Sequence, residues 1–118
     1  PGSNISTSNI PTGYQIIKYW VDDPAEYLRY QNGILDAPIF RYAEALLIYA
    51  EAKAELGECT QSDLDISVNL LRKRAGMPDM VIDQLVKDPM SDFPSLPVLI
   101  DEIRRERRVE FALENMHW

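Results

Sequence analysis

Apolar residues recur at helical spacing between residues 39 and 57, and they do so on two sides of the predicted helix. One stripe holds Ala43, Leu46, Leu47, Ala50 and Ala54, and a second holds Tyr42, Ala45, Tyr49, Ala52 and Leu56. This period predicts a helix over 39–57, with Pro38 near its start and Gly57 at its end. Because the helix is apolar over most of its circumference, we expect other elements to cover it on more than one side.

A second helix is predicted over 63–75, with Ser62 as its N-cap and Gly76 at its end. Its apolar residues again fall on two sides, with Leu64, Val68, Leu71 and Ala75 on one and Ile66 and Leu70 on the other. The following segment is irregular, with a possible turn or two of helix over Met80 to Val86. We expect these two helices to form an antiparallel hairpin.

A third helix is predicted over 98–116, with a buried face marked by Leu99, Ile103 and Leu113. Residues 1–38 are predicted to be extended and loop-like, with a possible short strand from Tyr14 to Val21. The predicted fold is therefore all-α: a tetratricopeptide-like helical hairpin plus a further helix, in a helical-repeat-like region over 39–118. Since such stacks need about three units, we expect the chain to be a fragment of a longer protein or to associate with another copy.

Two carboxylates, Glu106 and Glu110, project from the middle of the apolar face of the third predicted helix. A buried carboxylate without a partner is strongly unfavourable, so these acids should be paired. We expect a structural salt-bridge network in which Arg41 is the first choice of partner, in bidentate geometry. Arg72 is the second choice, and Arg107 completes the network.

The same two glutamates could instead perform general acid–base chemistry. Four arginines stand close to them in the sequence RRERR, and arginines hold carboxylates ionised, which is the wrong state for a general acid near neutral pH. We therefore favour the structural network and assign no catalytic residue. A nucleic-acid patch at RRERR is disfavoured because the acids of the same helix outnumber its arginines; these are Asp101, Glu102, Glu106, Glu110 and Glu114.

Composition narrows the function classes further. The chain has 118 residues, one domain's worth, with a net charge of −7 and an isoelectric point near 4.6, which argues against a nucleic-acid partner. The single cysteine, Cys59, excludes an internal disulfide and a cysteine-built zinc site, and the single histidine, His117, excludes sites that need two. We expect no metal, no cofactor and no membrane-spanning helix.

Four segments together resemble one known family. FRYAEALLIYAEAKAELG is similar to the near-signature RYAEvLLnYAEA…ELG of SusD/RagB-type proteins, and NLLRKRAGMPD is similar to their N-x-x-R-x-RAG-x-P segment. IRRERRVEFALENMHW resembles IRxERRxELAFEGxRW, and TGYQIIKYWVDD resembles a segment that precedes the signature. The resemblance covers about residues 11–118. At residues 115–117 the chain has Asn-Met-His where the family usually has Gly-x-Arg.

The resemblance implies a fragment of the helical-repeat region of a SusD-like outer-membrane lipoprotein. Such proteins are not enzymes and use no cofactor. They bind an oligosaccharide or other nutrient at the extracellular face and pass it to a SusC-type TonB-dependent transporter. Their lipid anchor is attached to a cysteine at the mature N-terminus, so Cys59 is not that residue and the anchor would lie outside this fragment.

Five aromatic residues within a short stretch form the candidate ligand surface: Tyr14, Tyr19, Trp20, Tyr27 and Tyr30. Aromatic faces stack well on sugar rings, and Trp20 with Tyr19 is the first choice for a ligand contact. The alternative is that these side chains pin an extended segment onto the helices. For the protein as a whole, the alternatives to glycan binding are a helical-repeat scaffold for a protein partner and a hydrolase that uses Glu106 and Glu110.

Overall fold

The computed structural model describes residues 39–114, and these residues are helical. The elements are α2 (Tyr42–Glu55), α3 (Gln61–Asp65), α4 (Val68–Arg74), a 3-10 turn η2 (Ile82–Gln84) and α5 (Val98–Glu110). No strand occurs within 39–114, and the predicted all-α class is confirmed. The possible strand at Tyr14 to Val21 lies outside the described residues.

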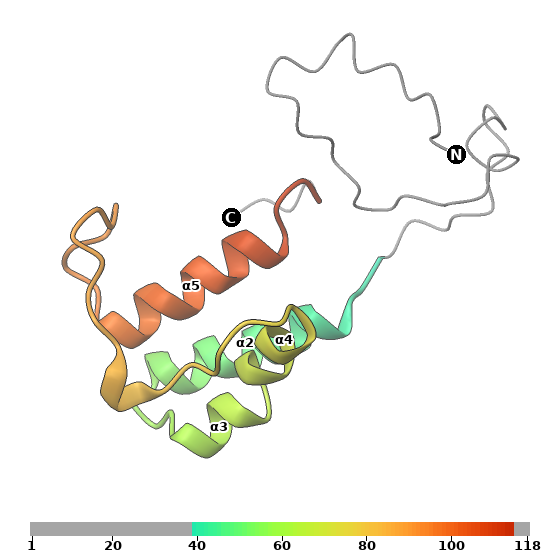
Figure 1. The fold of residues 1–118 in the computed structure, drawn as a ribbon, viewed down its shortest axis with the longest axis horizontal. Helices are drawn as coiled ribbons and strands as arrows, with labels where there is room; N and C mark the ends of the chain where they lie inside the picture. Colours follow the sequence, from blue (N-terminus) through green and yellow to red (C-terminus); the bar gives the residue numbers. More distant parts are fainter. Residues whose placement is uncertain (1–38, 115–118) are drawn as a thin grey trace, which may run out of the picture. The chain divides into compact units, whose positions relative to one another are not determined.

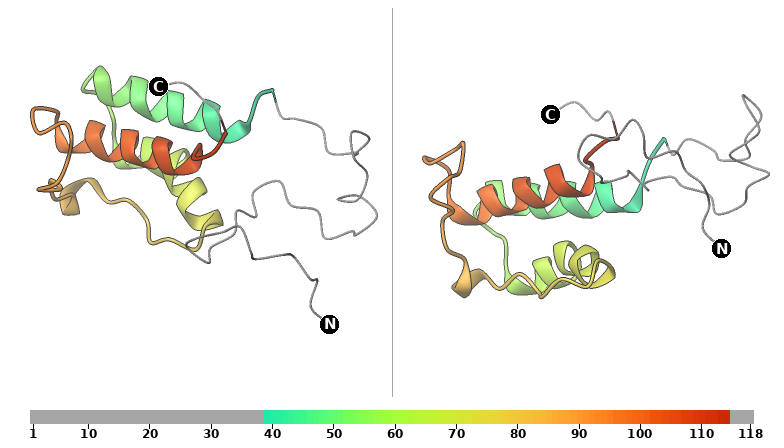
Figure 2. Two further views of the ribbon diagram at one scale, coloured as in Figure 1. Left: turned by 90° about the horizontal axis from the view of Figure 1, so that it is seen from above. Right: turned by 45° about the horizontal axis from the view of Figure 1, so that its top comes forward.

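The helices α2 and α5 lie side by side and run in opposite directions in all three views (Figures 1 and 2). After α2 the chain turns back into α3 and α4, which pack along one side of this pair. The turn is made at Gly57, whose φ of +70° suits a residue without a side chain. Gly76 ends α4 in the same way, also with a φ of +70°.

The core lies where the inner stripe of α2 meets the other helices. Leu47 and Ala50 are fully buried there, and Phe111, directly after α5, is 2% exposed. The rest of the buried cluster is Ala43, Ala54, Leu64, Val68, Met80, Ile100 and Ile103. The alanines of α2 allow the neighbouring helices to approach closely, so a small set of side chains fills the core.

The second apolar stripe of α2 is exposed. Tyr42 is 73% exposed and Leu56 71%, and Ala45 and Ala52 between them are also exposed. Within residues 39–114 the predicted cover on a second side of this helix is therefore absent. The outer residues of the second predicted helix, Ile66 and Leu70, are exposed as well.

The helix predicted over 63–75 is two helices, and its N-cap is Thr60 rather than Ser62. Thr60 and Asp63 form a capping box: each side chain bonds the backbone N–H of the other. The break comes at Ser67, whose buried hydroxyl donates to the Asp63 carbonyl and so competes with the helical backbone. The capping box thus starts the first helix earlier than predicted, and the serine interrupts it.

The third predicted helix ends at Glu110, several residues before the predicted end at 116. Leu113 has a φ of +69°, a left-handed conformation that no helix continues. Leu113 is 68% exposed and so does not belong to the buried face as predicted; Phe111 takes its place. Ile103 is fully buried as predicted, Leu99 packs at the edge of the core, and the turn expected within Met80 to Val86 is η2.

Candidate functional site

The flank of α5 that faces α2 carries ion pairs that join the two helices. Glu51 accepts from the Arg104 Nε at 3.0 Å and from the Arg107 Nη1 at 2.6 Å. At the other end of the interface, Arg41 holds Glu110 and Glu114 at once. Arg41 also stacks on the Phe111 ring, with 5.4 Å between the guanidinium carbon and the ring centroid. Antiparallel packing brings these groups together, because the start of α2 meets the end of α5.

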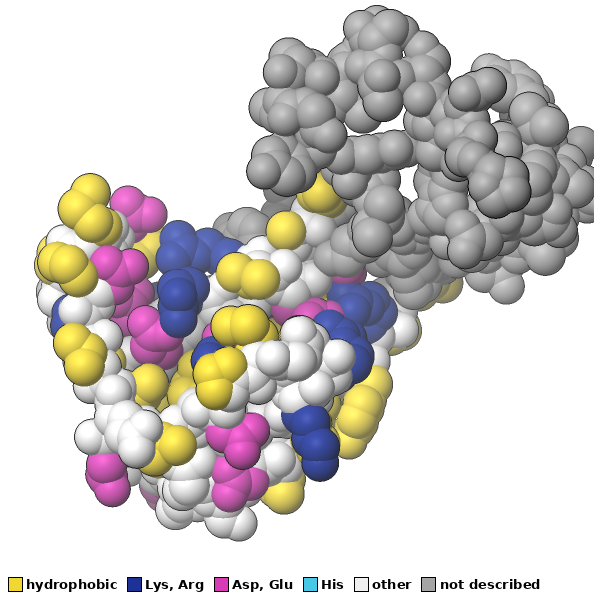
Figure 3. All heavy atoms as spheres, in the orientation of Figure 1, with side chains coloured by type: hydrophobic (Ala, Val, Ile, Leu, Met, Phe, Trp, Pro, Cys, Tyr) yellow, Lys and Arg dark blue, Asp and Glu magenta, His cyan; other side chains and the backbone are white. Residues whose placement is uncertain are grey.

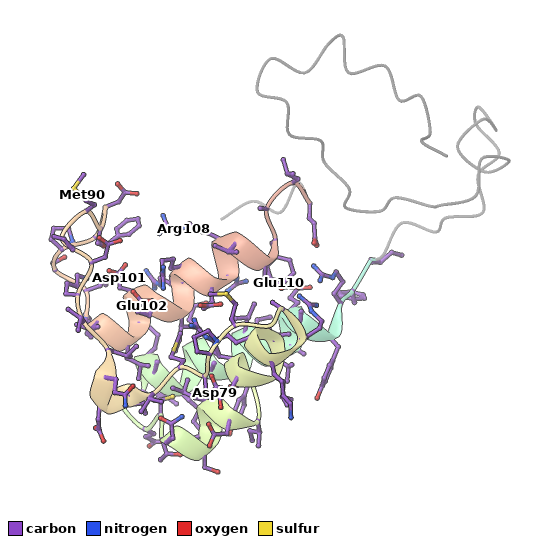
Figure 4. All side chains as sticks on the ribbon, viewed as in Figure 1. Asp79, Met90, Asp101, Glu102, Arg108 and Glu110 are labelled. Carbon is purple, nitrogen blue, oxygen red and sulfur yellow. The ribbon has the colours of Figure 1, made fainter. Side chains whose placement is uncertain are left out.

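The flank that faces α4 carries a second set of pairs. Arg72 of α4 is paired with Glu106, and the Arg74 Nη2 lies 2.6 Å from Glu110. Glu110 is thus shared by α2 and α4, and its side chain is 12% exposed. Figure 4 shows Glu110 at the end of α5 that lies beside the start of α2.

The structure places the residues of the predicted network as follows. Arg41 contacts Glu110, and Arg72 contacts Glu106. Arg41 bridges two carboxylates with its two terminal nitrogens, where a bidentate grip on one was predicted. Arg107 lies against Glu51 on the α2 flank. Trp20 and Tyr19, the predicted ligand contacts, lie outside the described residues.

A polar cavity of about 270 Å³ lies between α5 and the chain that follows α4. We call it the Glu102 cavity. Its walls carry two guanidinium groups, two carboxylates and an amide, and its other side chains are apolar; the lining residues are Arg72, Asp79, Met80, Val81, Gln84, Leu85, Val86, Glu102 and Arg105. Figure 4 shows Glu102 on α5 and Asp79 on the segment beyond α4.

The wall opposite α5 is fixed by two amide side chains. Asn69 is 4% exposed; its Oδ1 accepts from the Met80 N–H at 2.6 Å and its Nδ2 donates to the Met80 carbonyl at 3.1 Å. Gln61 holds the next residues in the same way, with its Oε1 3.0 Å from the Ile82 N–H and its Nε2 2.9 Å from the Met80 carbonyl. These bonds imitate strand pairing and keep the irregular segment at a set distance from α5.

Three of the four charged side chains that line the cavity form ion pairs: Glu102 with Arg105, and Arg72 with Glu106 beside the cavity. Glu102 is 9% exposed, and its Oε2 accepts from the Arg105 Nη2 at 2.5 Å and the Arg105 Nε at 3.0 Å. The Arg72 Nε donates to the Pro78 carbonyl at 2.6 Å, and its Nη1 to Glu106. Figure 3 shows basic and acidic side chains next to one another on this face, with no large patch of one sign.

A second cavity, of about 290 Å³, adjoins the first and shares Arg72 and Arg105 with it. We call it the Val109 cavity. Its lining is more apolar and lies between α4 and α5; the lining residues are Leu71, Arg72, Ala75, Met77, Arg105, Glu106, Val109 and Glu110. Together the two cavities follow the α4 flank of α5.

The whole chain matches the model of one protein family. This model, the SusD family, covers residues 1–118. The chain belongs to the SusD family. No curated protein and no solved structure matches it significantly. Members of the SusD family bind glycans or other nutrients at the outer membrane in general, and the family is one of binding proteins.

The described part of this SusD-family chain offers binding groups and no activated nucleophile. Burial, together with the nearby Asp63 carboxylate, raises the pKa of the Cys59 thiol, so the thiol stays protonated near neutral pH. Residues 39–114 contain no cluster of metal-ligating side chains, and no helix among them is long and apolar enough to cross a membrane. The carboxylates and guanidinium groups of α5, with the amide of Gln84 on the facing segment, can form hydrogen bonds with a ligand.

Sequence reasoning did not find the residues that shape the Glu102 cavity. The helical period places Arg105 outside the buried face, facing solvent or another partner, Glu102 counts only as one of the acids of that helix, and Asp79 lies in the segment predicted to be irregular. One signal was available: Asn69 interrupts the apolar stripes of its helix, and a buried asparagine needs several hydrogen-bond partners. Such a residue indicates that a loop without secondary structure is held nearby.

Proposed function

We propose that this chain is part of a non-catalytic nutrient-binding lipoprotein of the outer membrane. In this proposal the protein binds an oligosaccharide at the extracellular face and passes it to a SusC-type TonB-dependent transporter. The observation that carries the proposal is the match of the family model over residues 1–118. The hydrogen-bonding groups along α5 support it, because sugar hydroxyls bind to carboxylates, guanidinium groups and amides.

The proposed absence of catalysis is supported by the pairing of the acids on α5. Glu106 and Glu110 each contact an arginine, and arginine favours the ionised carboxylate. Purified chain should show no glycosidase or esterase turnover, and turnover that Glu106→Gln abolishes would contradict this part of the proposal.

Oligosaccharide binding is tested with the purified 118-residue chain on an array of neutral and acidic glycans, followed by isothermal titration with each hit. We expect weak binding to at least one glycan. Transporter partnership is tested separately, by co-purification of the lipidated parent protein with the TonB-dependent transporter. Absence of binding to every glycan on the array would contradict a nutrient site within this chain.

A protein-interaction scaffold is the second candidate, and the outer stripe of α2 favours it. Tyr42, Ala45 and Leu56 form an exposed apolar row along the helix, and exposed apolar rows commonly mark protein contacts. The glycan array distinguishes the two functions, because a protein that serves only as a scaffold for a protein partner binds no glycan. Tyr42→Lys should then weaken binding to a protein partner and leave any glycan binding unchanged.

A further inference from the structure

The Glu102 cavity contains hydrogen-bonding atoms that no described residue satisfies. The two bonds that Glu102 accepts both end on its Oε2, so its Oε1 has no partner within residues 39–114. Every fully buried side-chain oxygen or nitrogen of the described residues has a hydrogen-bond partner. Because the Glu102 Oε1 has none among these residues, it is accessible, and the space beside it is the cavity that Glu102 lines. A carboxylate that is 9% exposed thus offers a free acceptor at a fixed position.

Free donors complement this acceptor. Arg72 uses its Nε and Nη1 within the protein, which leaves its Nη2 for a ligand, and Arg105 keeps its Nη1. Asp79 and Gln84, on the opposite wall, are exposed and add one more carboxylate and one more amide. The cavity therefore offers donors and acceptors from both walls, as a ligand with several hydroxyl groups requires.

The charges in the cavity favour a neutral ligand. Arg105 is neutralised by Glu102, and Arg72 by Glu106. The remaining charge belongs to Asp79, and it is negative. An anionic ligand such as a uronate would meet this carboxylate without an unpaired cation to offset it. Recognition then rests on the geometry of hydrogen bonds rather than on net charge.

The volume and the apolar lining of the Glu102 cavity narrow the class of ligand further. The volume of about 270 Å³ lies just below the roughly 300–1,000 Å³ of pockets that hold drug-sized ligands, so it suits a single sugar ring. Val81 and Leu85, both half-buried, supply a small apolar surface beside the polar groups, which suits the C–H face of a pyranose. Gln61 and Asn69 hold this wall in place, so the cavity is largely formed before a ligand arrives.

We propose that the Glu102 cavity is a subsite for one neutral sugar unit, bound between Glu102, Arg105 and Arg72 of the helices and Asp79 of the facing segment. This inference rests on the proposed glycan-binding function and adds a location and a ligand class. A second unit of the same chain would extend into the adjoining Val109 cavity, where Leu71 and Val109 provide more apolar surface.

The test is a titration of the full chain followed by two-dimensional NMR of backbone amides. The probes are the methyl glycosides of glucose, galactose and mannose, with the methyl glycoside of glucuronic acid as the charged counterpart. We expect a neutral glycoside to bind on the order of millimolar and to shift the amide signals of residues 79–85 and 102–105. The glucuronide should bind more weakly than glucoside.

Asp79→Ala and Asp83→Ala form a matched pair of variants. Both aspartates are exposed and lie on the same segment, but Asp79 lines the cavity and Asp83 does not. We expect Asp79→Ala to weaken binding about fivefold to tenfold, within the range for the loss of one hydrogen bond, and Asp83→Ala to change it less than about twofold. Glu102→Gln, with its helix content checked by circular dichroism, should weaken binding by a similar factor.

The outcomes separate this inference from the proposed function. If a glycan binds but the cavity amides do not shift, or if Asp79→Ala and Glu102→Gln bind as the parent does, the subsite is overturned and the proposed function stands. Tighter binding of the glucuronide overturns the neutral ligand class. If no glycan and no glycoside binds, both the subsite and the proposal of a nutrient site within this chain are overturned.

Discussion

The two flanks of α5 carry the same kinds of charged residue but differ in what these residues do. Towards α2, each pair joins two helices, and Arg41 and Glu51 each hold two partners. Towards α4, Arg72 and Arg74 also pair with glutamates of α5, but Arg105 is paired within its own helix, with Glu102 three residues away. Both cavities described above lie on this second flank.

The difference follows from the length of the opposing element. α2 has 14 residues and runs alongside α5, so complementary charges meet along the interface. α4 has 7 residues and is followed by an irregular segment. Hydrogen bonds from Gln61 of α3 and Asn69 of α4 hold this segment, and its Met80 is buried in the core. We infer that the pairs that join α2 to α5 stabilise the fold, whereas the Glu102–Arg105 pair on the α4 flank leaves polar atoms available to a ligand.

The largest effect is expected for Glu110→Gln. Glu110 is 12% exposed and accepts from Arg41 of α2 and Arg74 of α4, so its loss leaves Arg41 partly buried with one carboxylate fewer. Breaking a buried pair from one side costs roughly 3–5 kcal/mol, and partial exposure reduces this to about 2–4 kcal/mol. Urea unfolding monitored by circular dichroism measures it, with the exposed Glu58→Gln as control. A loss below about 1 kcal/mol would show that the pairs of Glu110 with Arg41 and Arg74 do not stabilise the fold.

Glu51→Gln should have the next largest effect. Glu51 is 19% exposed and receives two arginines of α5, so we expect a loss of about 1–2 kcal/mol in the free energy of unfolding. The neighbouring Glu55 is 48% exposed and receives one, so Glu55→Gln should cost less than about 0.5 kcal/mol. Equal losses in the free energy of unfolding for the two variants would mean that the strength of the ion pairs on this flank does not depend on their burial.

Much of this arrangement could be predicted from periodicity, because the signals are local. The stripes of α2 and the glycines that end α2 and α4 depend on neighbouring residues alone, and the sequence also shows that Glu106 and Glu110 share a face with Ile103. The split between α3 and α4 depends on side-chain bonds to the backbone of Asp63, whose N–H donates to Thr60 and whose carbonyl accepts from Ser67; hydrophobic periodicity does not reveal such bonds.

The cavity could not be predicted, because it depends on contacts between distant residues. Arg105 and Glu102 are neighbours on one helix and resemble an ordinary surface pair. Their role depends on the segment around Met80, which Asn69 holds opposite them from a distance of 11 residues in the chain. The early end of α5 was missed for a similar reason, since Phe111 is drawn into the core and the backbone turns at Leu113.

An acid titration provides a reference that lies on neither flank of α5. Hydrogen bonds from Thr60 and from Tyr49 lower the pKa of Asp63 to about 2. Because this is below the ordinary value of about 3.9, Asp63 stabilises the folded chain above about pH 4, and this contribution is lost as the pH falls from 4 towards 2.

The test is the Asp63→Asn variant, which should be less stable than the parent at pH 7 and should lose less stability between pH 4 and pH 2. Tyr49→Phe removes one of the two donors and should give an intermediate slope. Urea midpoints measured at several pH values check both. An unchanged slope in Asp63→Asn would mean that the capping box of α3 does not contribute to acid stability.

The smallest effect is expected for Arg105→Gln, on the α4 flank. Arg105 is 50% exposed and its bonds to Glu102 lie within one helix turn, so losing them separates no two elements, and pairs of this kind contribute about 0.3–0.5 kcal/mol. The Glu102 carboxylate that remains faces the cavity, where water can replace the guanidinium. In urea unfolding, the free energy of unfolding of Arg105→Gln should therefore be nearly the same as that of the parent, both in low salt and in 1 M sodium chloride. A loss as large as that of Glu51→Gln would show that the pair holds the fold together, and that the two flanks of α5 do not differ in the way inferred here.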